Sequence, residues 1–272
     1  MSVHNENIKK VTATNLVAMK AKGEKIAMLT VYDYSMAVIM DQSGVDAVLV
    51  GDSAANVMSG YSSTLPITLE QMIYHAQCVV RGVRRAHVAV DMPFGSYQVS
   101  EEEAVRAAIR MIKETGADSV KMEGGEEIIG AIRKIINAGI PVMGHLGLMP
   151  QSINKYGTYA LRAKDDEEAA KLISDATLLE AAGCYAIVLE KIPASLAQQV
   201  TQRLRIPTIG IGAGSGTDGQ VLVMQDMLGI NKGFAPKFLR KYANLFDDIT
   251  NAFTNYISDV KSGSYPNENE QY

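Results

Sequence analysis

Four acidic residues and one histidine follow short, mostly apolar segments of the chain, at the points where buried strands would end. They are Asp52, Asp91, Glu123, His145 and Glu190. A carboxylate is costly to bury unless a charged group meets it. One such acid would be explained by a local contact, but five polar residues in equivalent positions predict one shared site. The parallel strands of an α/β barrel would bring them together, because all of its strands end at one face.

Three of the acids suggest a metal site. Asp52, Asp91 and Glu123 follow the second, third and fourth predicted strands, which are neighbours in a barrel. Three adjacent carboxylates repel one another unless a cation lies between them. Hard oxygen ligands without cysteine or several histidines favour Mg²⁺ or a similar ion over zinc. The alternative is that each acid caps the following helix or pairs with a lysine, which is easier to accept for one acid than for all three.

The remaining polar residues have different expected roles. Lys121 precedes Glu123 by two residues, so strand alternation places both on the same face, where a lysine needs an anionic partner. The alternative is a lysine that extends to solvent. Glu190 ends the sixth strand, across the mouth from the metal cluster, as suits a base acting on a bound substrate. Three roles are open for His145: it could polarise the substrate, orient another group of the site or be structural.

A repeated pattern along the chain predicts the elements that position these residues. Gly44, Gly116, Gly139 and Gly183 each end a helical stretch and precede a β-rich run. Strands are predicted near residues 26–31, 47–51, 87–91, 119–123, 141–145, 186–190, 207–211 and 220–224. Helices are predicted to follow the cap residues Thr68, Ser100 and Asp165. Alternating strands and helices predict a parallel sheet.

Eight strands without a linker-like stretch favour a single (β/α)₈ TIM-type barrel over residues 1–272, with a doubly wound open sheet as the alternative. Residues 1–25 form an expected N-terminal extension, whose helix at 14–21 would cap one end of the barrel. The polar tail at 262–272 is expected to be frayed. The glycine-rich run at 210–214 lacks dinucleotide-fingerprint spacing and is predicted to be a loop at the barrel mouth.

Composition excludes several classes of protein. The chain has 272 residues, 47% of them hydrophobic and 21% charged, and a net charge of -4 that argues against a nucleic-acid partner. Two cysteines give no disulfide framework and no paired metal spacing. The start of the chain is polar where a secretory segment would be apolar, and no apolar run approaches the ~18 residues of a membrane span. We therefore expect a cytoplasmic protein without a membrane partner.

Short motifs along nearly the whole chain resemble one enzyme family, ketopantoate hydroxymethyltransferase. They are Leu-Thr-Val-Tyr-Asp-Tyr at 29–34, Val-Gly-Asp-Ser at 50–53, Ser-Thr-Leu-Pro at 63–66, Asp-Met-Pro-Phe at 91–94, Val-Lys-Met-Glu-Gly-Gly at 120–125, Gly-His-Leu-Gly-Leu at 144–148, Val-Leu-Glu at 188–190, Ile-Gly-Ile-Gly-Ala-Gly at 209–214 and Thr-Asp-Gly-Gln at 217–220. Their common order along the chain, rather than any one motif, makes the resemblance specific.

The resemblance implies a TIM barrel, a Mg²⁺ ion and a homo-oligomer, a decamer by analogy with the family. The family's metal positions match Asp52, Asp91 and Glu123. Its keto-acid positions match Asp52, Ser53, Asp91 and Lys121, and its catalytic proton acceptor matches Glu190.

The implied reaction transfers a one-carbon unit from 5,10-methylenetetrahydrofolate to 3-methyl-2-oxobutanoate. It gives 2-dehydropantoate for pantothenate and coenzyme A biosynthesis, through a Mg-stabilised enolate. Two departures from the family pattern stand out: Ala54-Ala55-Asn56 where a Leu-Gly pair is expected, and Met149 where threonine is common. Two other functions remain open from the residues: a Mg²⁺-dependent lyase or aldolase for pyruvate-like acids, and a non-catalytic binder of small anions or nucleotides.

Overall fold

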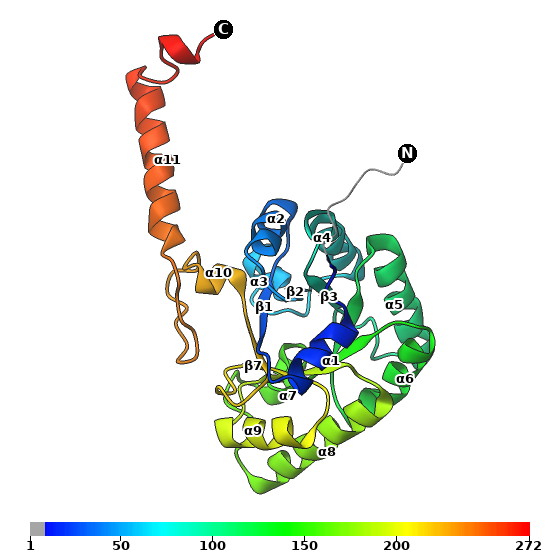
Figure 1. Ribbon diagram of the computed structural model, residues 1–272. Coiled ribbons are helices and arrows are strands. Elements are labelled where there is room, and N and C mark those ends of the chain that lie inside the picture. The colour runs from blue at the N-terminus through cyan, green and yellow to red at the C-terminus, as the bar shows by residue number, and fades with distance from the viewer. Residues whose placement is uncertain (1–8) are drawn as a thin grey trace. The chain divides into compact units, whose positions relative to one another are not determined.

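The computed structural model describes residues 9–272, which divide into two compact units, one ending at Leu222 and the other comprising Val223–Tyr272. The first unit is a closed barrel of eight parallel strands in sequential order, with β8 pairing with β1 (Figure 1). The strands are β1 (Ile26–Thr30), β2 (Ala47–Val50), β3 (His87–Asp91), β4 (Ser119–Glu123), β5 (Val142–Gly147), β6 (Ala186–Glu190), β7 (Thr208–Ile211) and β8 (Gly219–Leu222). The predicted (β/α)₈ barrel is confirmed, and the open sheet is wrong.

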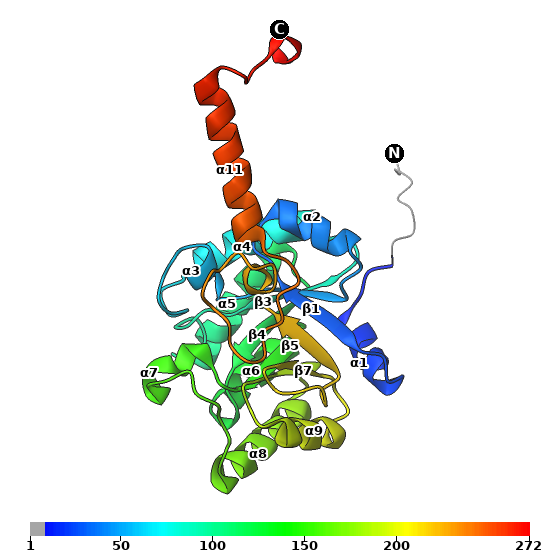
Figure 2. The same ribbon diagram turned by 90° about the vertical axis from the view of Figure 1, so that its left-hand side faces the viewer.

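Helices surround this barrel (Figures 1 and 2). They are α1 (Ala13–Ala21), α2 (Tyr34–Gln42), α3 (Ala54–Val57), α4 (Leu69–Gly82), α5 (Glu101–Thr115), α6 (Ile129–Asn137), α7 (Ile153–Tyr156), α8 (Asp166–Ala182) and α9 (Ala194–Arg203), with 3₁₀ turns η1 (Glu126–Ile128) and η2 (Pro150–Ser152). The predicted starts are confirmed: Thr68 caps α4 in a full capping box, and Ser100 and Asp165 accept from the third backbone N–H of α5 and α8. Gly116 and Gly183 end α5 and α8 in the left-handed conformation.

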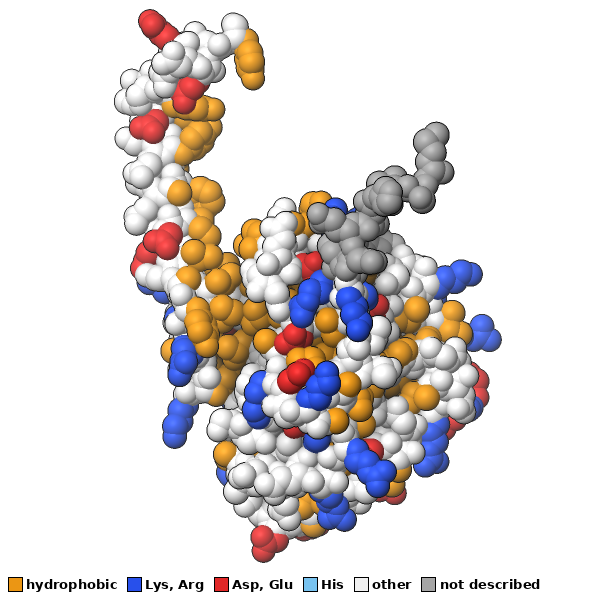
Figure 3. Space-filling view, in the orientation of Figure 1, with side chains coloured by type: hydrophobic (Ala, Val, Ile, Leu, Met, Phe, Trp, Pro, Cys, Tyr) orange, Lys and Arg blue, Asp and Glu red, His pale blue; other side chains and the backbone are white. Residues whose placement is uncertain are grey.

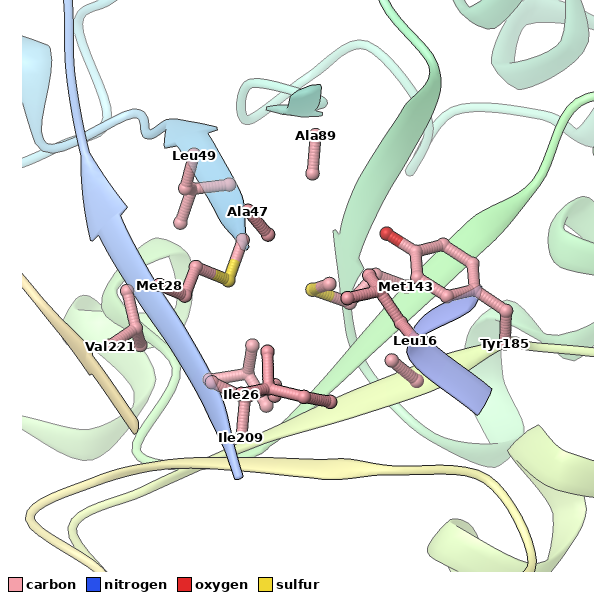
Figure 4. Close-up of a cluster of buried hydrophobic side chains, with 12 residues drawn as sticks. Leu16, Ile26, Met28, Ala47, Leu49, Ala89, Met143, Tyr185, Ile209 and Val221 are labelled. Atoms are coloured by element: carbon pink, nitrogen blue, oxygen red, sulfur yellow. The ribbon is translucent and has the colours of Figure 1, made fainter. Parts of the chain in front are cut away.

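Helix α1 closes one end of the barrel, as predicted. Its Leu16 is buried in a cluster that includes Ile26 of β1, Met143 of β5 and Tyr185, which directly precedes β6 (Figure 4). Burying a leucine side chain stabilises the fold by roughly 2 kcal/mol. The first eight residues of the predicted N-terminal extension lie outside the described residues. The glycine-rich run at 210–214 leads from the end of β7 into the loop before β8, as expected for a loop of the barrel.

The second unit contains two helices, α10 (Met224–Met227) and α11 (Leu245–Ser262), and the 3₁₀ turn η3 (Glu268–Glu270). Apolar side chains lie along one side of α11, and all of them are exposed (Figure 3). They are Phe246, Ile249, Phe253, Tyr256, Ile257 and Val260. Neither the single domain over 1–272 nor the frayed tail at 262–272 is tested, and both stay predictions. Among the described helices, none combines the length and apolar character needed to cross a membrane.

Candidate active site

The five polar residues predicted to share a site lie at the carboxyl ends of neighbouring strands. Asp91, Glu123 and Glu190 are the last residues of β3, β4 and β6, while His145 lies within β5 and Asp52 comes two residues after β2. The strand register pairs Asp91 with Lys121 and Glu123 with His145. Barrel closure therefore brings together residues up to 138 positions apart in the chain, which is the separation of Asp52 and Glu190.

Lys121 and Asp91 form a buried ion pair. Lys121 Nζ lies 2.7 Å from Asp91 Oδ1, and both side chains are almost completely removed from solvent. Burial raises the pKa of Asp91, and the lysine opposes that shift. Burial disfavours charge on Lys121, but the carboxylates of Asp91, Glu123 and Asp52 outweigh it and raise the pKa of the ammonium group. The inward-facing lysine predicted from strand alternation is confirmed, and its anionic partner is Asp91.

His145 connects two of the acids. Its Nδ1 lies 3.3 Å from Glu123 Oε1, and its Nε2 lies 3.4 Å from Glu190 Oε2. Burial and the nearby Lys121 lower the pKa of His145, but the two glutamates outweigh them and raise it to about 9. As an imidazolium ion at neutral pH, His145 lies within ion-pair distance of both glutamates. The 3.2 Å approach of Lys121 Nζ to Nδ1 is then a like-charge contact.

Asp52 carries the least compensated charge of the cluster. Burial raises its pKa well above the ordinary value, and repulsion by Asp91 and Glu123 raises it further. Its backbone N–H donates to Asp91 Oδ2 over 2.9 Å, which fixes the two acids side by side. In contrast, His145, Lys121 and a backbone N–H outweigh the effect of burial on Glu123 and lower its pKa.

Ser53 stands beside this cluster, at the start of the short helix α3. Its hydroxyl lies 2.8 Å from the Tyr32 hydroxyl, which in turn donates to Thr30 Oγ1 over 2.8 Å. A Cβ at Gly51 would come within 2.8 Å of Ser53 Oγ, so a larger residue there would displace the serine hydroxyl. The departure at 54–56 forms the first three residues of α3, where both alanines are buried.

Two further residues complete the site, and neither was predicted as a functional residue. Gln151, in η2, donates through Nε2 to Asp52 Oδ2 at 2.9 Å and through its backbone N–H to Glu123 Oε2 at 2.9 Å. The Tyr97 hydroxyl donates to Gln151 Oε1 at 2.7 Å. For Gln151, the feature of the sequence that could have indicated a role is a polar residue in the turn that follows the buried strand β5. Met149, the second departure, precedes this turn without taking part in these hydrogen bonds.

The described part of the chain holds no group of three or more His, Cys, Asp and Glu side chains close enough to coordinate a metal as they stand. Lys121 holds one oxygen of Asp91, and both oxygens of Glu123 contact protein groups. The assignment of Asp52, Asp91 and Glu123 as metal ligands is therefore still a prediction. The donor set is nevertheless hard, and its three carboxylates outnumber the two cationic side chains beside them.

A parallel eight-stranded barrel with buried acids, a lysine and a histidine at the carboxyl ends of its strands defines a TIM-barrel enzyme suited to acid–base chemistry on a small anion. The chain belongs to the ketopantoate hydroxymethyltransferase family, whose sequence model matches residues 10–268. It is accordingly an enzyme of the group-transferase class, as the resemblance in its motifs predicts.

Known proteins resemble the chain over its full length. The 3-methyl-2-oxobutanoate hydroxymethyltransferase of Bacteroides thetaiotaomicron is 65% identical over 268 residues, 98% of each chain. The protein of the same name from Cytophaga hutchinsonii is 64% identical over 272 residues, 100% of each chain. Among solved structures, a phosphoenolpyruvate phosphomutase from Streptomyces platensis subsp. rosaceus aligns with a TM-score of 0.61 at 14% identity, covering 93% of this chain and 88% of its own. That likeness shows the fold alone.

Proposed function

We propose that the chain transfers a one-carbon unit from 5,10-methylenetetrahydrofolate to 3-methyl-2-oxobutanoate, giving 2-dehydropantoate. Full-length relatives named for this activity support the proposal. The observation that carries it in the structure is the placement of Glu190 at 3.4 Å from His145, on the other side of the histidine from the buried cluster of Asp52, Asp91 and Lys121. A base and an anion-binding group thus face one substrate from two sides.

The first requirement is a place for a divalent cation. Carboxylate oxygens are the ligands that Mg²⁺ prefers. Burial raises the pKa values of Asp52 and Asp91, so both carboxylates are costly to ionise in a site without a further cation. We assign the ion to Asp52 and Asp91, with Glu123 as the third ligand. When bound, the ion supplies Lewis acidity toward the carboxylate and keto oxygens of a 2-oxo acid, stabilising the negative charge that develops as the acid loses its C3 proton.

The second requirement is a set of residues that bind the substrate carboxylate. The buried ammonium group of Lys121 is the nearest cation to Asp91, and the Ser53 hydroxyl lies at the turn after Asp52. A charge-assisted hydrogen bond from lysine is worth about twice a neutral one. Together these residues orient the 2-oxo acid so that its C3 faces away from the buried cluster.

Glu190 is the proposed proton acceptor. Of the four acids it is the most exposed, with a side chain 16% accessible, so its carboxylate reaches the mouth where a second substrate arrives. His145 Nε2 lies 3.4 Å from this carboxylate. Glu190 takes the C3 proton, and the resulting carbon nucleophile attacks the methylene carbon of the folate. Both bonds from that carbon to the folate nitrogens break over the reaction, water supplies the hydroxyl oxygen of the product, and tetrahydrofolate leaves.

The experiment that tests this proposal separates proton abstraction from transfer. With Mg²⁺ and no folate, the wild-type enzyme should exchange the C3 proton of 3-methyl-2-oxobutanoate for deuterium, followed by proton NMR. Glu190→Gln should lose roughly 10²–10⁴-fold in exchange rate while still binding the keto acid. Glu167→Gln, an exposed glutamate in α8, is the matched control and should exchange normally. Wild-type exchange in Glu190→Gln would remove Glu190 from the mechanism, and cleavage of the acid without folate would indicate a lyase.

A further inference from the structure

Lys191 directly follows Glu190 and holds a strained backbone conformation. Its φ is +44°, in the left-handed region, and Ala163 at +51° is the only other non-glycine residue with positive φ in the part of the chain that the structure describes. Such conformations are unfavourable for residues with a Cβ and persist where surrounding contacts hold them, often next to functional sites. The contacts of Lys191 therefore show which parts of the structure hold it in this conformation.

Three hydrogen bonds make Lys191 a junction between separate parts of the barrel mouth. Its backbone N–H donates to Ile211 O at the end of β7 over 2.9 Å, and its carbonyl accepts from the Arg162 N–H over 2.9 Å. Its Nζ donates to the carbonyl oxygen of Tyr159. Lys191 thus ties the end of β6 both to β7 and to the segment 157–163, which is part of the connection between α7 and α8.

The same segment is also fixed at its own ends. The Ala163 N–H donates to Glu168 Oε2 over 2.7 Å, and the Arg162 guanidinium forms an ion pair with Glu168. That guanidinium group lies 4.2 Å from the centroid of the Tyr156 ring, a cation–π contact. Held at these points, the segment presents Tyr159 in its middle, with 45% of the residue exposed.

The carbonyl oxygen of Tyr159 accepts from Lys191 Nζ, so this tyrosine is tied to the residue that follows Glu190. Burial raises the pKa of its phenol, and the negative charges of Glu190 and Asp52 raise it further, as expected of a hydroxyl within electrostatic reach of both acids. Because the Tyr159 ring is exposed, it has a face available for stacking on another flat ring. The folate proposed as one-carbon donor carries such a ring system, whereas the keto acid does not.

We infer that Lys191 is a positioning residue that holds the segment 157–163 against the end of β6, so that the Tyr159 ring contacts the planar ring of the one-carbon donor. The inference rests on the proposed function, because it assigns a binding contact to the second substrate of that reaction. Tyr159 is the binding residue in this arrangement, and Lys191 acts through it.

The experiment compares the Michaelis constant for methylenetetrahydrofolate with the keto-acid exchange rate in the same samples. Lys191→Ala and Lys191→Gly both remove the ammonium group, but only the glycine relieves the backbone strain. We expect both to raise the folate KM roughly ten-fold, as does Tyr159→Ala, with a much smaller change in kcat. Lys191→Arg keeps a donor and should recover part of the loss. Lys164→Ala removes an exposed lysine of the same connection and is the matched control.

The outcomes separate this inference from the proposed function. A raised folate KM with exchange still catalysed by the same sample supports the inference. Unchanged folate KM in the Lys191 and Tyr159 variants overturns it while leaving the proposed function intact. Exchange that falls in parallel with transfer shows that Lys191 serves Glu190 alone, which also overturns it. A wild-type enzyme that gives neither exchange nor product overturns the proposed function, and the inference with it.

Discussion

Replacing Lys121 by methionine would leave the buried carboxylate of Asp91 without its ion-pair partner. The two side chains are 4% and 3% exposed, and their charged atoms are 2.7 Å apart. Removing one partner of such a buried pair typically costs about 3–5 kcal/mol, because the other charge is left without compensation. Asp91 can limit this cost by binding a proton, since burial already raises its pKa and Lys121 is the main group opposing that shift. We therefore expect a loss near the lower end, about 3 kcal/mol at pH 7.

The sign of the pH dependence follows from the same contacts. Without Lys121, the folded-state pKa of Asp91 rises further above its unfolded value, so the folded variant binds more protons than the unfolded chain. The stability deficit of Lys121→Met relative to wild type should thus grow as pH rises through that pKa and shrink as pH falls below it. Urea unfolding followed by circular dichroism between pH 5 and 8, in metal-free buffer, measures both effects.

A double-mutant cycle isolates the ion pair. The double variant Lys121→Met, Asp91→Asn carries neither charge of this ion pair. Its loss in the free energy of unfolding should therefore be smaller than the sum of the two single losses, by about 1–3 kcal/mol. Lys164→Met, at an exposed lysine, should change the free energy of unfolding by less than about 0.5 kcal/mol. Additive losses, or a Lys121→Met deficit that does not vary with pH, would refute the electrostatic reasoning.

Four further outcomes are expected. Excess chelator should abolish exchange and transfer, Mg²⁺ should restore both, and full activity in chelator would exclude the metal. Gly147→Ala should lower the unfolding free energy by at least ~1–2 kcal/mol and impair exchange, because φ is +95° and the new Cβ would lie 2.3 Å from Glu190 O. Burial lowers the pKa of His87 to about 4, below its unfolded value near 6.5, so the unfolded chain binds a proton more readily as pH falls. The free energy of unfolding should therefore drop by up to about 3 kcal/mol between pH 6.5 and 4, and urea unfolding of His87→Gln should show a weaker acid dependence than wild type. Light scattering should give a mass several times the 29.4 kDa of one chain if the predicted homo-oligomer forms.

The barrel was predictable because its signals are local. Each glycine that ends a helix, such as Gly116 or Gly183, acts through its own backbone angles, and each strand is marked by a few consecutive apolar residues. The eighth strand, predicted at 220–224, is observed at Gly219–Leu222. The helix α11 was not predicted, although apolar residues at 246, 249, 253, 256, 257 and 260 have helical spacing. Strand-and-turn signals, on which the barrel prediction relied, are missing there.

The site was predictable to the extent that its residues end strands. Asp52, Asp91, Glu123, His145 and Glu190 were found from position alone, because barrel closure fixes where strand ends meet. The contact between Gln151 and Asp52 spans 99 residues and depends on how a loop folds back over the strand ends. Neither spacing nor residue type determines that path. The pairing of Lys121 with Asp91, rather than with Glu123 on its own strand, likewise comes from the register of β3 against β4.

The acids of the cluster differ in how far neighbouring groups compensate their negative charge, although their residue types are alike. Glu123 is satisfied by His145 and by the Gln151 N–H, and its pKa is lowered despite complete burial. Burial raises the pKa of Asp52, and repulsion by Asp91 and Glu123 adds to that shift. Lys121 and the neutral amide of Gln151 oppose it without cancelling it. A divalent cation is favourable where negative charge remains uncompensated, which is at Asp52 and its neighbour Asp91. Glu123, the third proposed ligand, also lies 3.3 Å from His145, whose Nε2 lies 3.4 Å from Glu190, so one acid links the proposed metal site to the proposed base.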